Sequence, residues 1–243
     1  MMRTLMTVLA LAFVLAMSTV AIAETGIYED FESGTIGGGW HWTSADFIET
    51  SGGNPDSYGR CPEAWLPTPV YFSGWDAPGW TGDYTAMGVT GFSIDVMTIS
   101  TQNSYFDEYP MFLTIMNHMG TPDDYNDDVF VYTNPDTYFA PGAGTGWHSY
   151  QWDIPSDFVG GPGEMPAGWS GGNWADWNNL PDGMTWQDMM TNAGRLEVRT
   201  LRFGMVALFD PYNMGADNVE LYYETGPVAT EEMTFGGVKS LFR

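Results

Sequence analysis

Seven tryptophans in glycine- or proline-rich segments are the residues of this chain that best suit ligand binding. They are Trp40, Trp42, Trp75, Trp80, Trp169, Trp174 and Trp177. A flat indole ring covers the apolar C–H face of a sugar at low entropic cost, while Asp, Asn and Gln side chains hydrogen-bond its hydroxyls. Such segments are typical of surface loops, so we expect these rings to contact a glycan. Burial in the core is the competing interpretation, which we prefer for Trp147 and Trp152 because they lie in a strand-like run.

The acids and histidines lack the spacing that indicates catalysis. Hydrolysis of a glycoside requires two carboxyl groups flanking the bond, and the acids of Glu29–Glu32 cannot all face one side of a strand with period two. The histidines His41, His118 and His148 form neither H-x-H nor H-E-x-x-H, so no catalytic metal is indicated. We therefore expect a non-enzymatic protein, with a glycoside hydrolase or lyase as the less favoured alternative.

Three of the seven tryptophans share one unusual segment, Gly160–Gly183. It is dense in Gly, Pro, Trp, Asn and Asp and shows no period. A loop of this length is usually either functional or disordered. Its three tryptophans, with Trp186 directly after it, argue against disorder, so we expect a ligand-contacting insertion.

Composition excludes several partners. The chain has 31 Asp and Glu against 7 Lys and Arg, a net charge of −24. Nucleic acids and anionic membrane surfaces both need a basic face, so neither is an expected partner. The single cysteine, Cys61, allows no internal disulfide. Its neighbours Arg60 and Pro62 supply no base, so a catalytic thiol is not expected.

The two ends of the chain have separate expected roles. Residues 1–23 combine Arg3, the apolar run Leu5–Met17 and the small-residue site Ala21-Ile22-Ala23, the pattern of a bacterial-type Sec signal peptide. We expect export and a secreted or cell-surface location. One domain is expected over residues 24–225. The end, 226–243, contains the cationic-apolar Thr234–Arg243 and is either a sorting or docking segment or a frayed terminus.

The elements that must position the tryptophans are short strands. Alternating or apolar runs predict strands over Ile27–Glu32, Val70–Phe72, Gly91–Thr98, Met111–Asn117, Val129–Thr133, Trp147–Ile154, Leu201–Phe209 and Val219–Tyr223. The last two are expected to be joined by a turn-rich loop, Asp210–Asp217. One helix is expected over Thr185–Ala193, with Thr185 as N-cap and Gly194 as the stop. This pattern predicts an all-β fold, a jelly-roll β-sandwich of two antiparallel sheets with one short helix.

The order of several short motifs resembles the laminin IV type A (laminin B) domain and, more broadly, jelly-roll carbohydrate-binding modules. These motifs are Gly52–Pro55, Ala77–Asp83, Gly91–Val96, Asp128–Val131, Trp147–Tyr150 and Asp217–Val219. The resemblance extends over most of Glu29–Tyr223 and implies an extracellular, non-catalytic jelly-roll sandwich. The chain lacks the cysteine pairs of animal laminins, which suggests a free-standing bacterial-type relative.

The resemblance also implies a structural calcium where the first strand meets the last Asp-containing turn. Transferred to this chain, the ligands are Asp30, Glu32, Asp83 and Asp217, which offer the hard oxygens that Ca²⁺ prefers. Asp123–Asp128 is a second candidate, although it does not complete the D-x-[DN]-x-[DN]-G pattern. The alternative for each acid is a place on a solvated surface.

Together these features predict a secreted, non-catalytic, calcium-stabilised binding module for an extracellular glycan or matrix polymer. The alternative is a structural or adhesive cell-surface module with a protein partner.

Overall fold

The computed structural model describes residues 25–35, 40–42, 47–65, 71–73, 77–102, 109–121, 126–202 and 211–224. Thr25–Tyr223 forms one compact unit. The predicted signal peptide and C-terminal segment lie outside the described residues. No helix in the described ranges is long and apolar enough to span a membrane.

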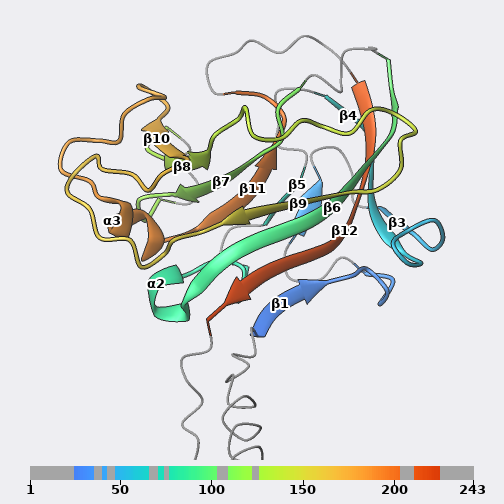
Figure 1. Ribbon diagram of the computed structural model, residues 1–243, viewed down its shortest axis with the longest axis horizontal. Helices are drawn as coiled ribbons and strands as arrows, with labels where there is room; N and C mark the ends of the chain where they lie inside the picture. Colours follow the sequence, from blue (N-terminus) through green and yellow to red (C-terminus); the bar gives the residue numbers. More distant parts are fainter. Residues whose placement is uncertain are drawn as a thin grey trace, which may run out of the picture. The chain divides into compact units, whose positions relative to one another are not determined.

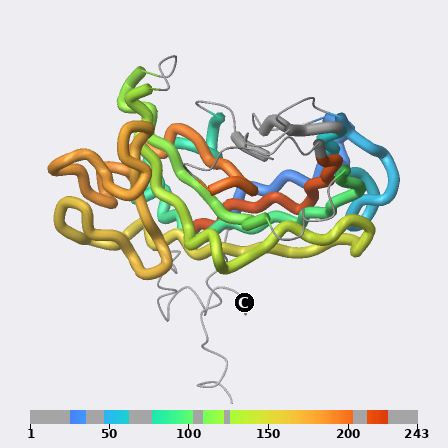
Figure 2. The backbone as a smooth tube through the Cα atoms, turned by 90° about the horizontal axis from the view of Figure 1, so that it is seen from above, coloured from blue at the N-terminus to red at the C-terminus, as the bar shows by residue number. Residues whose placement is uncertain are grey.

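Two antiparallel sheets form the domain (Figures 1 and 2). The first sheet has the order β3-β4-β12-β6-β9, and β1 also pairs with β12. Its strands are β1 (Thr25–Glu29), β3 (Phe47–Glu49), β4 (Tyr58–Trp65), β6 (Val89–Thr101), β9 (His148–Asp153) and β12 (Pro211–Tyr223). The second sheet has the order β10-β8-β7-β11-β5-β2. Its strands are β2 (Trp40–Trp42), β5 (Tyr71–Ser73), β7 (Phe112–Asn117), β8 (Val129–Thr133), β10 (Trp169–Asn173) and β11 (Arg195–Arg199). The predicted all-β sandwich of two antiparallel sheets is confirmed.

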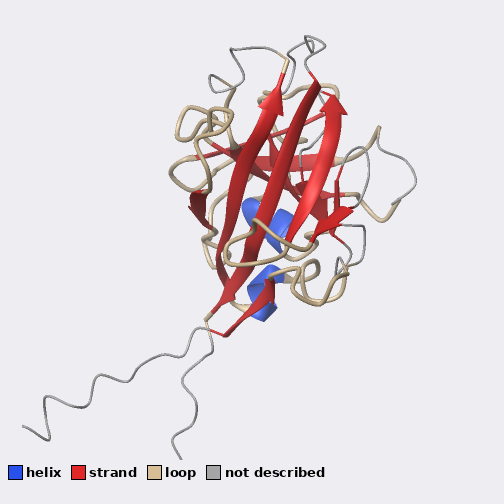
Figure 3. Ribbon diagram, turned by 90° about the vertical axis from the view of Figure 1, so that its right-hand side faces the viewer, coloured by secondary structure: helices blue, strands red, loops and turns tan. Residues whose placement is uncertain are grey.

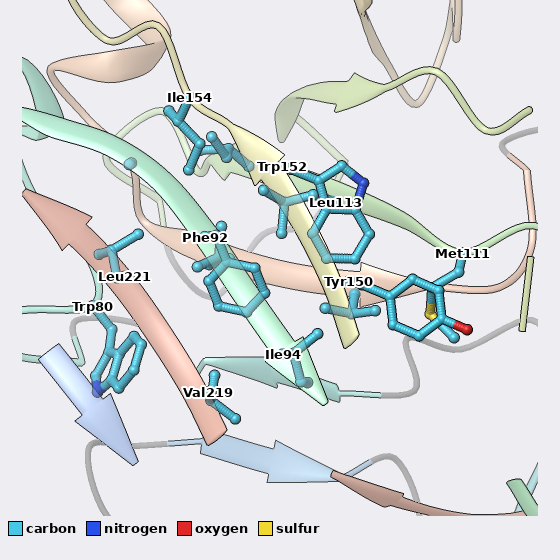
Figure 4. Close-up of a cluster of buried hydrophobic side chains, with 14 of the residues drawn as sticks. Trp80, Phe92, Ile94, Met111, Leu113, Tyr150, Trp152, Ile154, Val219 and Leu221 are labelled. Atoms are coloured by element: carbon cyan, nitrogen blue, oxygen red, sulfur yellow. The ribbon is translucent and has the colours of Figure 1, made fainter. Parts of the chain in front are cut away.

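Alternating side chains from both sheets fill the space between them (Figure 4). The predicted alternation in β6 is confirmed, since Phe92, Ile94 and Val96 are all buried. Leu113 and Ile115 from β7 belong to the same core cluster. Burial of apolar area at about 25 cal/mol per Å² is the main force that holds the two layers together.

The predicted turn-rich loop Asp210–Asp217 is wrong, because from Pro211 onward it belongs to β12, a strand of 13 residues. β12 has partners on both sides: β6 lies along one, while β4 and then β1 follow each other along the other. These ladders override the local turn preference. Gly215 is required there, since a Cβ would lie 2.8 Å from the Tyr58 ring.

The described residues contain two short helices rather than the single one predicted. Helix α3 (Trp186–Met190) confirms the predicted N-cap Thr185, which forms a capping box with Asp188. The predicted stop at Gly194 is wrong, because the helix ends at Met190 with Thr191 as its C-cap. Helix α2 (Tyr84–Met87) is additional; Asp83 caps its first turn. Figure 3 shows both helices beside the long strands. Strands β4 and β10 were not predicted either, because Pro62 and the glycines of β10 lower the local strand preference.

Candidate functional site

The segment Gly160–Gly183 lies at one end of the sandwich, around the edge strand β10 (Figures 1 and 2). Beyond β10 the chain folds back over both faces of that strand. On one face the Trp177 backbone approaches Gly172 so closely that a Cβ there would lie 2.4 Å from it. On the other, Leu180 lies over Gly171 and Val131. We call residues 174–183, which contact both faces of β10, the wrapping loop.

Asparagine and aspartate side chains fix the shape of the wrapping loop. The Asn173 Oδ1 accepts from the backbone N–H groups of Ala175 and Asp176, at 2.8 and 2.9 Å. The Asp176 carboxylate accepts from the Asn178 N–H at 3.0 Å and from the Asn179 Nδ2 at 2.9 Å. These hydrogen bonds lower the pKa of Asp176 below its usual value, so its carboxylate stays ionised.

A cavity of about 690 Å³ opens between this loop and the segment that precedes β10. We call it the β10 cavity. It is lined by Pro162, Gly163, Met165, Trp169, Ser170, Gly171, Asn173, Asp176, Asn178, Asn179, Leu180, Pro181, Asp182 and Gly183. Its size is within the range of small-molecule sites. Amides and carboxylates dominate its polar side chains, and Trp169, Met165 and Leu180 supply apolar wall.

Three predicted ligand-binding tryptophans are at or beside the β10 cavity. Trp169 lines it, although the side chain is only 9% exposed. The ring packs edge-on against Trp186 with centroids 5.0 Å apart, and its Nε1 donates to the Asp153 carbonyl. Trp174 and Trp177 belong to the wrapping loop and are 38% and 40% exposed. Trp174 packs edge-on against Phe130, so its ring is held in place.

The remaining tryptophans divide differently from the prediction. Trp80 is 2% exposed in the core, so its prediction as a ligand contact is wrong (Figure 4). Its Pro/Gly-rich setting does not expose it, because the segment packs against the sandwich. Trp40 and Trp42 have described backbone only, in β2, and Trp75 lies outside the described residues. The preference for a buried Trp152 is confirmed, whereas Trp147 is half-buried.

The sequence Gly168–Gly172 reads G-x-S-x-G, a pattern that in α/β-hydrolases places the serine on a sharp turn from strand to helix. Here those residues do not form such a turn. Trp169–Asn173 is a regular strand, and Ser170 pairs with Tyr132 of β8. The structure therefore does not present Ser170 as an activated nucleophile.

A second polar region lies at the middle of the long strands β6 and β12, in the other sheet. We call Asn54, Asp95, Asp217 and Asn218 the acidic cluster. Asp217 and Asp95 are cross-strand neighbours on β12 and β6, and both are buried. β4 pairs with β12 up to Ala216, and β1 pairs with it from Val219 onward. The two acids lie at the gap between these two ladders.

Hydrogen bonds to the two acids bridge this gap. The Asp217 Oδ2 accepts from the Asn54 N–H at 2.6 Å, and its Oδ1 accepts from the Asn218 N–H at 2.8 Å. The Asp95 Oδ2 accepts from the side-chain amides of Asn54 and Asn218, at 2.9 and 2.8 Å. Burial raises the pKa of Asp217 to about 6, against the lowering effect of its backbone hydrogen bonds; the charges of Asp95 and Glu32 raise it further.

The four predicted calcium ligands do not all meet. Glu32 is near Asp217 and accepts from the Ser57 N–H at 2.8 Å, and Asp30 directly follows β1. Asp83 instead caps α2, next to the start of β6. Asp95 lies six residue steps beyond Val89, a span of roughly 20 Å at about 3.3 Å per step, so Asp83 is too distant to share an ion with Asp217. Its inclusion in the set was wrong.

Sequence reasoning missed Asn54, Asp95 and Asn218 as members of this region. The alternation in β6 had placed Asp95 on the polar face, and only the long-range pairing shows that this face is covered. In the described part of the chain, no three His, Cys, Asp or Glu side chains converge as a complete metal site. Any ion here would therefore need amide or backbone oxygens as well.

The second calcium candidate, Asp123–Asp128, lies partly outside the described residues. Asp127 accepts from the Thr121 hydroxyl at 2.7 Å. Asp128 is buried, and its carboxylate has no hydrogen-bond partner in the described structure. Burial, and then the charge of Asp127, raise the pKa of Asp128 to about 6, while His118 and Arg195 act in the opposite direction. The two acids thus have different surroundings.

No family model matches this chain, and no curated protein matches it. The solved structures that are similar to it include the following two. An exo-beta-agarase has a TM-score of 0.42 and 11% identity, over 84% of this chain. The chain spans only 25% of that agarase. The L4b domain of human laminin alpha-2 has a TM-score of 0.33 and 7% identity, over 81% of this chain and 89% of that domain. These low values concern only the general arrangement of strands.

Proposed function

We propose that this chain is an extracellular, non-catalytic module that binds a glycan in the β10 cavity. The observation that carries the proposal is the cavity of about 690 Å³, which combines an indole wall with a ring of amide and carboxylate groups. Apolar surface with a few oriented polar groups is what a sugar requires, since each sugar ring has C–H faces and hydroxyl edges.

Individual residues have distinct roles in this proposal. Trp169 forms part of the wall, and the side chains of Asn173, Asn178 and Asn179 exchange hydrogen bonds with hydroxyls. The exposed rings of Trp174 and Trp177 extend the contact surface beyond the cavity. Because hydrogen bonds and packing already fix the wrapping loop, little further ordering is required when a ligand binds.

The state of Asp176 does not suit the general-acid role in glycoside hydrolysis. A glycoside hydrolase needs a carboxylic acid whose pKa is raised, so that it can protonate the leaving group. The pKa of Asp176 is lowered by its hydrogen bonds, which suits a hydrogen-bond acceptor. Incubating the protein with any polysaccharide that it binds should release no new reducing ends. Release of reducing ends would instead support the hydrolase alternative.

The binding test is biolayer interferometry against immobilised polysaccharides, with Trp177→Ala as the first variant. We expect its affinity to fall by about tenfold or more, equivalent to about 1.4 kcal/mol or more. Phe47→Ala is the matched control, because Phe47 is an exposed aromatic residue on the edge strand β3. Equal losses in both variants would contradict a site at β10. No binding to any polysaccharide would leave the adhesive protein-binding module as the better proposal.

We also propose that the acidic cluster, with Glu32, holds a structural calcium. Two buried acids directly opposite each other on neighbouring strands repel when ionised, and a divalent cation would remove that cost. Their carboxylates are the hard donors that calcium prefers. The side-chain amides of Asn54 and Asn218 direct their nitrogens at Asp95 in this structure and would turn their oxygens toward the ion. Calcium bound here would stabilise the junction between β1, β4 and β12.

The calcium proposal is tested by thermal melting with Ca²⁺ and with EDTA. At a ligand concentration of 100 times Kd, native-state binding contributes about 2.7 kcal/mol, equivalent to about 5–10 °C for a domain of this size. Asp83→Asn should leave this calcium response unchanged, since Asp83 caps α2. An unchanged melting temperature over a titrated calcium range would contradict the calcium proposal without affecting the glycan proposal.

A further inference from the structure

We infer that the ligand of the β10 cavity is an uncharged polysaccharide and that polyanionic glycans are rejected. This inference rests on the proposed glycan-binding function and specifies the class of glycan. It is carried by the distribution of charge around the cavity.

Among the residues that the structure describes, no cationic side chain lines the β10 cavity. Its two ionisable residues are Asp176 and Asp182, and its other polar side chains are those of Asn173, Asn178, Asn179 and Ser170. A uronate or sulfate group needs an Arg or Lys to replace its hydration, or else its burial costs several kcal/mol. Neutral hydroxyls, in contrast, donate to the carboxylates and accept from the amides.

The neighbouring surface has the same character. A second cavity of about 510 Å³ lies on the other side of residues 162–169 and shares Trp169 as a wall. Asp153 is its one ionisable acid or base at neutral pH, and its polar side chains include those of Asn134, Thr137 and Gln151. The adjacent turn carries Asp136, which forms an ion pair with Arg202. A chain leaving the β10 cavity on this side would meet neutral groups, the acid Asp153 and an arginine whose charge is already paired with Asp136.

The other described arginines are engaged elsewhere. Arg60 pairs with Glu49 at 2.5 Å, and Arg195 and Arg199 both pair with Glu197, at 2.6 and 2.7 Å. The net charge of −24 adds a repulsive field for any polyanion that approaches at low salt. The charges around the cavity and the net charge of the chain therefore both disfavour polyanionic glycans.

The acids do not make the cavity a site for polycations. Both oxygens of the Asp176 carboxylate accept hydrogen bonds from within the loop, from Asn178 and Asn179. Those bonds offset part of its charge, and amides outnumber acids in the lining. Neutral hydroxyl groups are the better match to this mixture of donors and acceptors.

The test measures binding to three classes of probe by biolayer interferometry. The neutral probes are hydroxyethyl cellulose, galactomannan and agarose oligosaccharides; the anionic probes are alginate and polygalacturonate; the cationic probe is chitosan. Each is measured at low salt and at about 1 M NaCl, where the Debye length is about 3 Å. We expect at least one neutral probe to bind about 100-fold tighter than either anionic probe, with little salt dependence.

A charge-reversal variant gives a second readout. Asp182→Lys should gain binding to polygalacturonate by about tenfold, because it introduces a cation into the lining. Asp157→Lys is the matched control, since Asp157 is exposed, lies outside the cavity lining and gives the same change in net charge. Equal gains in the two variants would show that net charge alone excludes polyanions, which overturns the role given to the cavity.

The remaining outcomes separate the two levels of the proposal. Binding of an anionic probe alone, lost in Trp177→Ala, would overturn this inference while leaving glycan binding intact. Chitosan binding that exceeds neutral binding at about 1 M NaCl would overturn it in the same way. Failure of every probe would overturn the proposed function, and this inference with it.

Discussion

The acidic cluster and the β10 cavity use the same residue types, Asp and Asn, in opposite ways. The cluster is centred on the middle of β6 and β12 in the first sheet, whereas the cavity adjoins the edge strand β10 of the second sheet (Figures 1 and 2). In the cluster, Asp95 and Asp217 are buried between long strands, and the amides around them point inward. In the cavity, Asp176 and Asn179 bond each other within an exposed loop that lines open space.

This difference shows that composition alone does not assign a role to a polar residue. Because Asp217 lies on a strand, its carboxylate accepts backbone hydrogen bonds at the point where the ladder of β12 is interrupted. Loop context leaves the cavity residues open to solvent. The first region should therefore respond to substitution in stability, and the second in binding.

Among substitutions in the two polar regions, the largest stability effect is expected from Asp217→Ala. It leaves the N–H groups of Asn54 and Asn218 without their acceptor. An unsatisfied buried donor costs about 1–3 kcal/mol, so we expect a loss of about 2–5 kcal/mol in the free energy of unfolding, measured by urea denaturation without calcium. Asp217→Asn, which keeps one acceptor oxygen, should lose less. A loss below about 1 kcal/mol for the alanine variant would break the contrast between the two regions.

A smaller loss is expected from Gly172→Val, which tests whether the wrapping loop needs close contact with β10. The new Cβ would lie 2.4 Å from the Trp177 backbone, so the loop must move. Overpacking of this kind typically costs about 1–3 kcal/mol, and glycan affinity should fall with it. Ser170→Ala, on the same strand, is the comparison. If Gly172→Val bound its glycan normally, the loop would not shape the site.

Asp128→Asn extends the comparison to a third buried acid. Unlike Asp95 and Asp217, Asp128 accepts no hydrogen bond from an asparagine in the described part of the chain. The pKa of Asp128 is raised to about 6 in the folded state. Between about pH 4 and pH 6, the folded state therefore keeps a proton on Asp128 that the unfolded state has already released. The stability of the wild type is not reduced by Asp128 below about pH 4, and it falls as the pH rises to about 6. The Asn variant should therefore gain about 1–2 kcal/mol relative to wild type between these pH values.

Four charged or titratable groups act on the pKa of Asp128: Asp127, His118, Arg195 and Glu197. Urea denaturation of both proteins at several pH values measures how the free energy of unfolding changes with pH. Parallel pH profiles for wild type and Asp128→Asn would show that Asp128 titrates normally.

The smallest stability effect is expected from Trp177→Ala, at less than about 1 kcal/mol. The ring is 40% exposed, so its removal leaves no enclosed void. Thermal melting of this variant should thus match wild type within a few degrees while its affinity for glycan falls. Trp80→Ala gives the opposite case, with a loss of about 3–5 kcal/mol expected from its buried ring.

The sequence predicted those elements whose local pattern agrees with their burial. The alternation in β6, the apolar run in β8 and the capping box at Thr185 are all found in the structure. β12 was misread because its turn-type residues are held by ladders from three other strands. β10 was missed because its glycines lower the local strand preference. Their role is to allow close packing with residues up to 40 positions away, such as Val131.

The candidate site was predictable only in part. The long Trp-rich segment could be singled out because its composition and its lack of period are local properties. The structure places it around the β10 cavity, and its contact with a ligand stays a prediction. The acidic cluster was not assembled correctly, because Asn54 and Asp217 are 163 residues apart and meet only through the sheet. Trp80 shows the same limit, because a Pro/Gly-rich setting does not reveal what covers a side chain.

The pairing of Thr25 with Tyr223 places the first and last strand residues of the domain side by side. A tensile load applied through both ends would peel β1 from β12 one residue pair at a time, instead of shearing the whole ladder at once. The domain should therefore yield at low force from this seam, while the β10 cavity at the far part of the other sheet stays folded until the core opens. The same adjacency makes the domain easy to insert into a loop of a host protein, since both joints occupy one point on its surface.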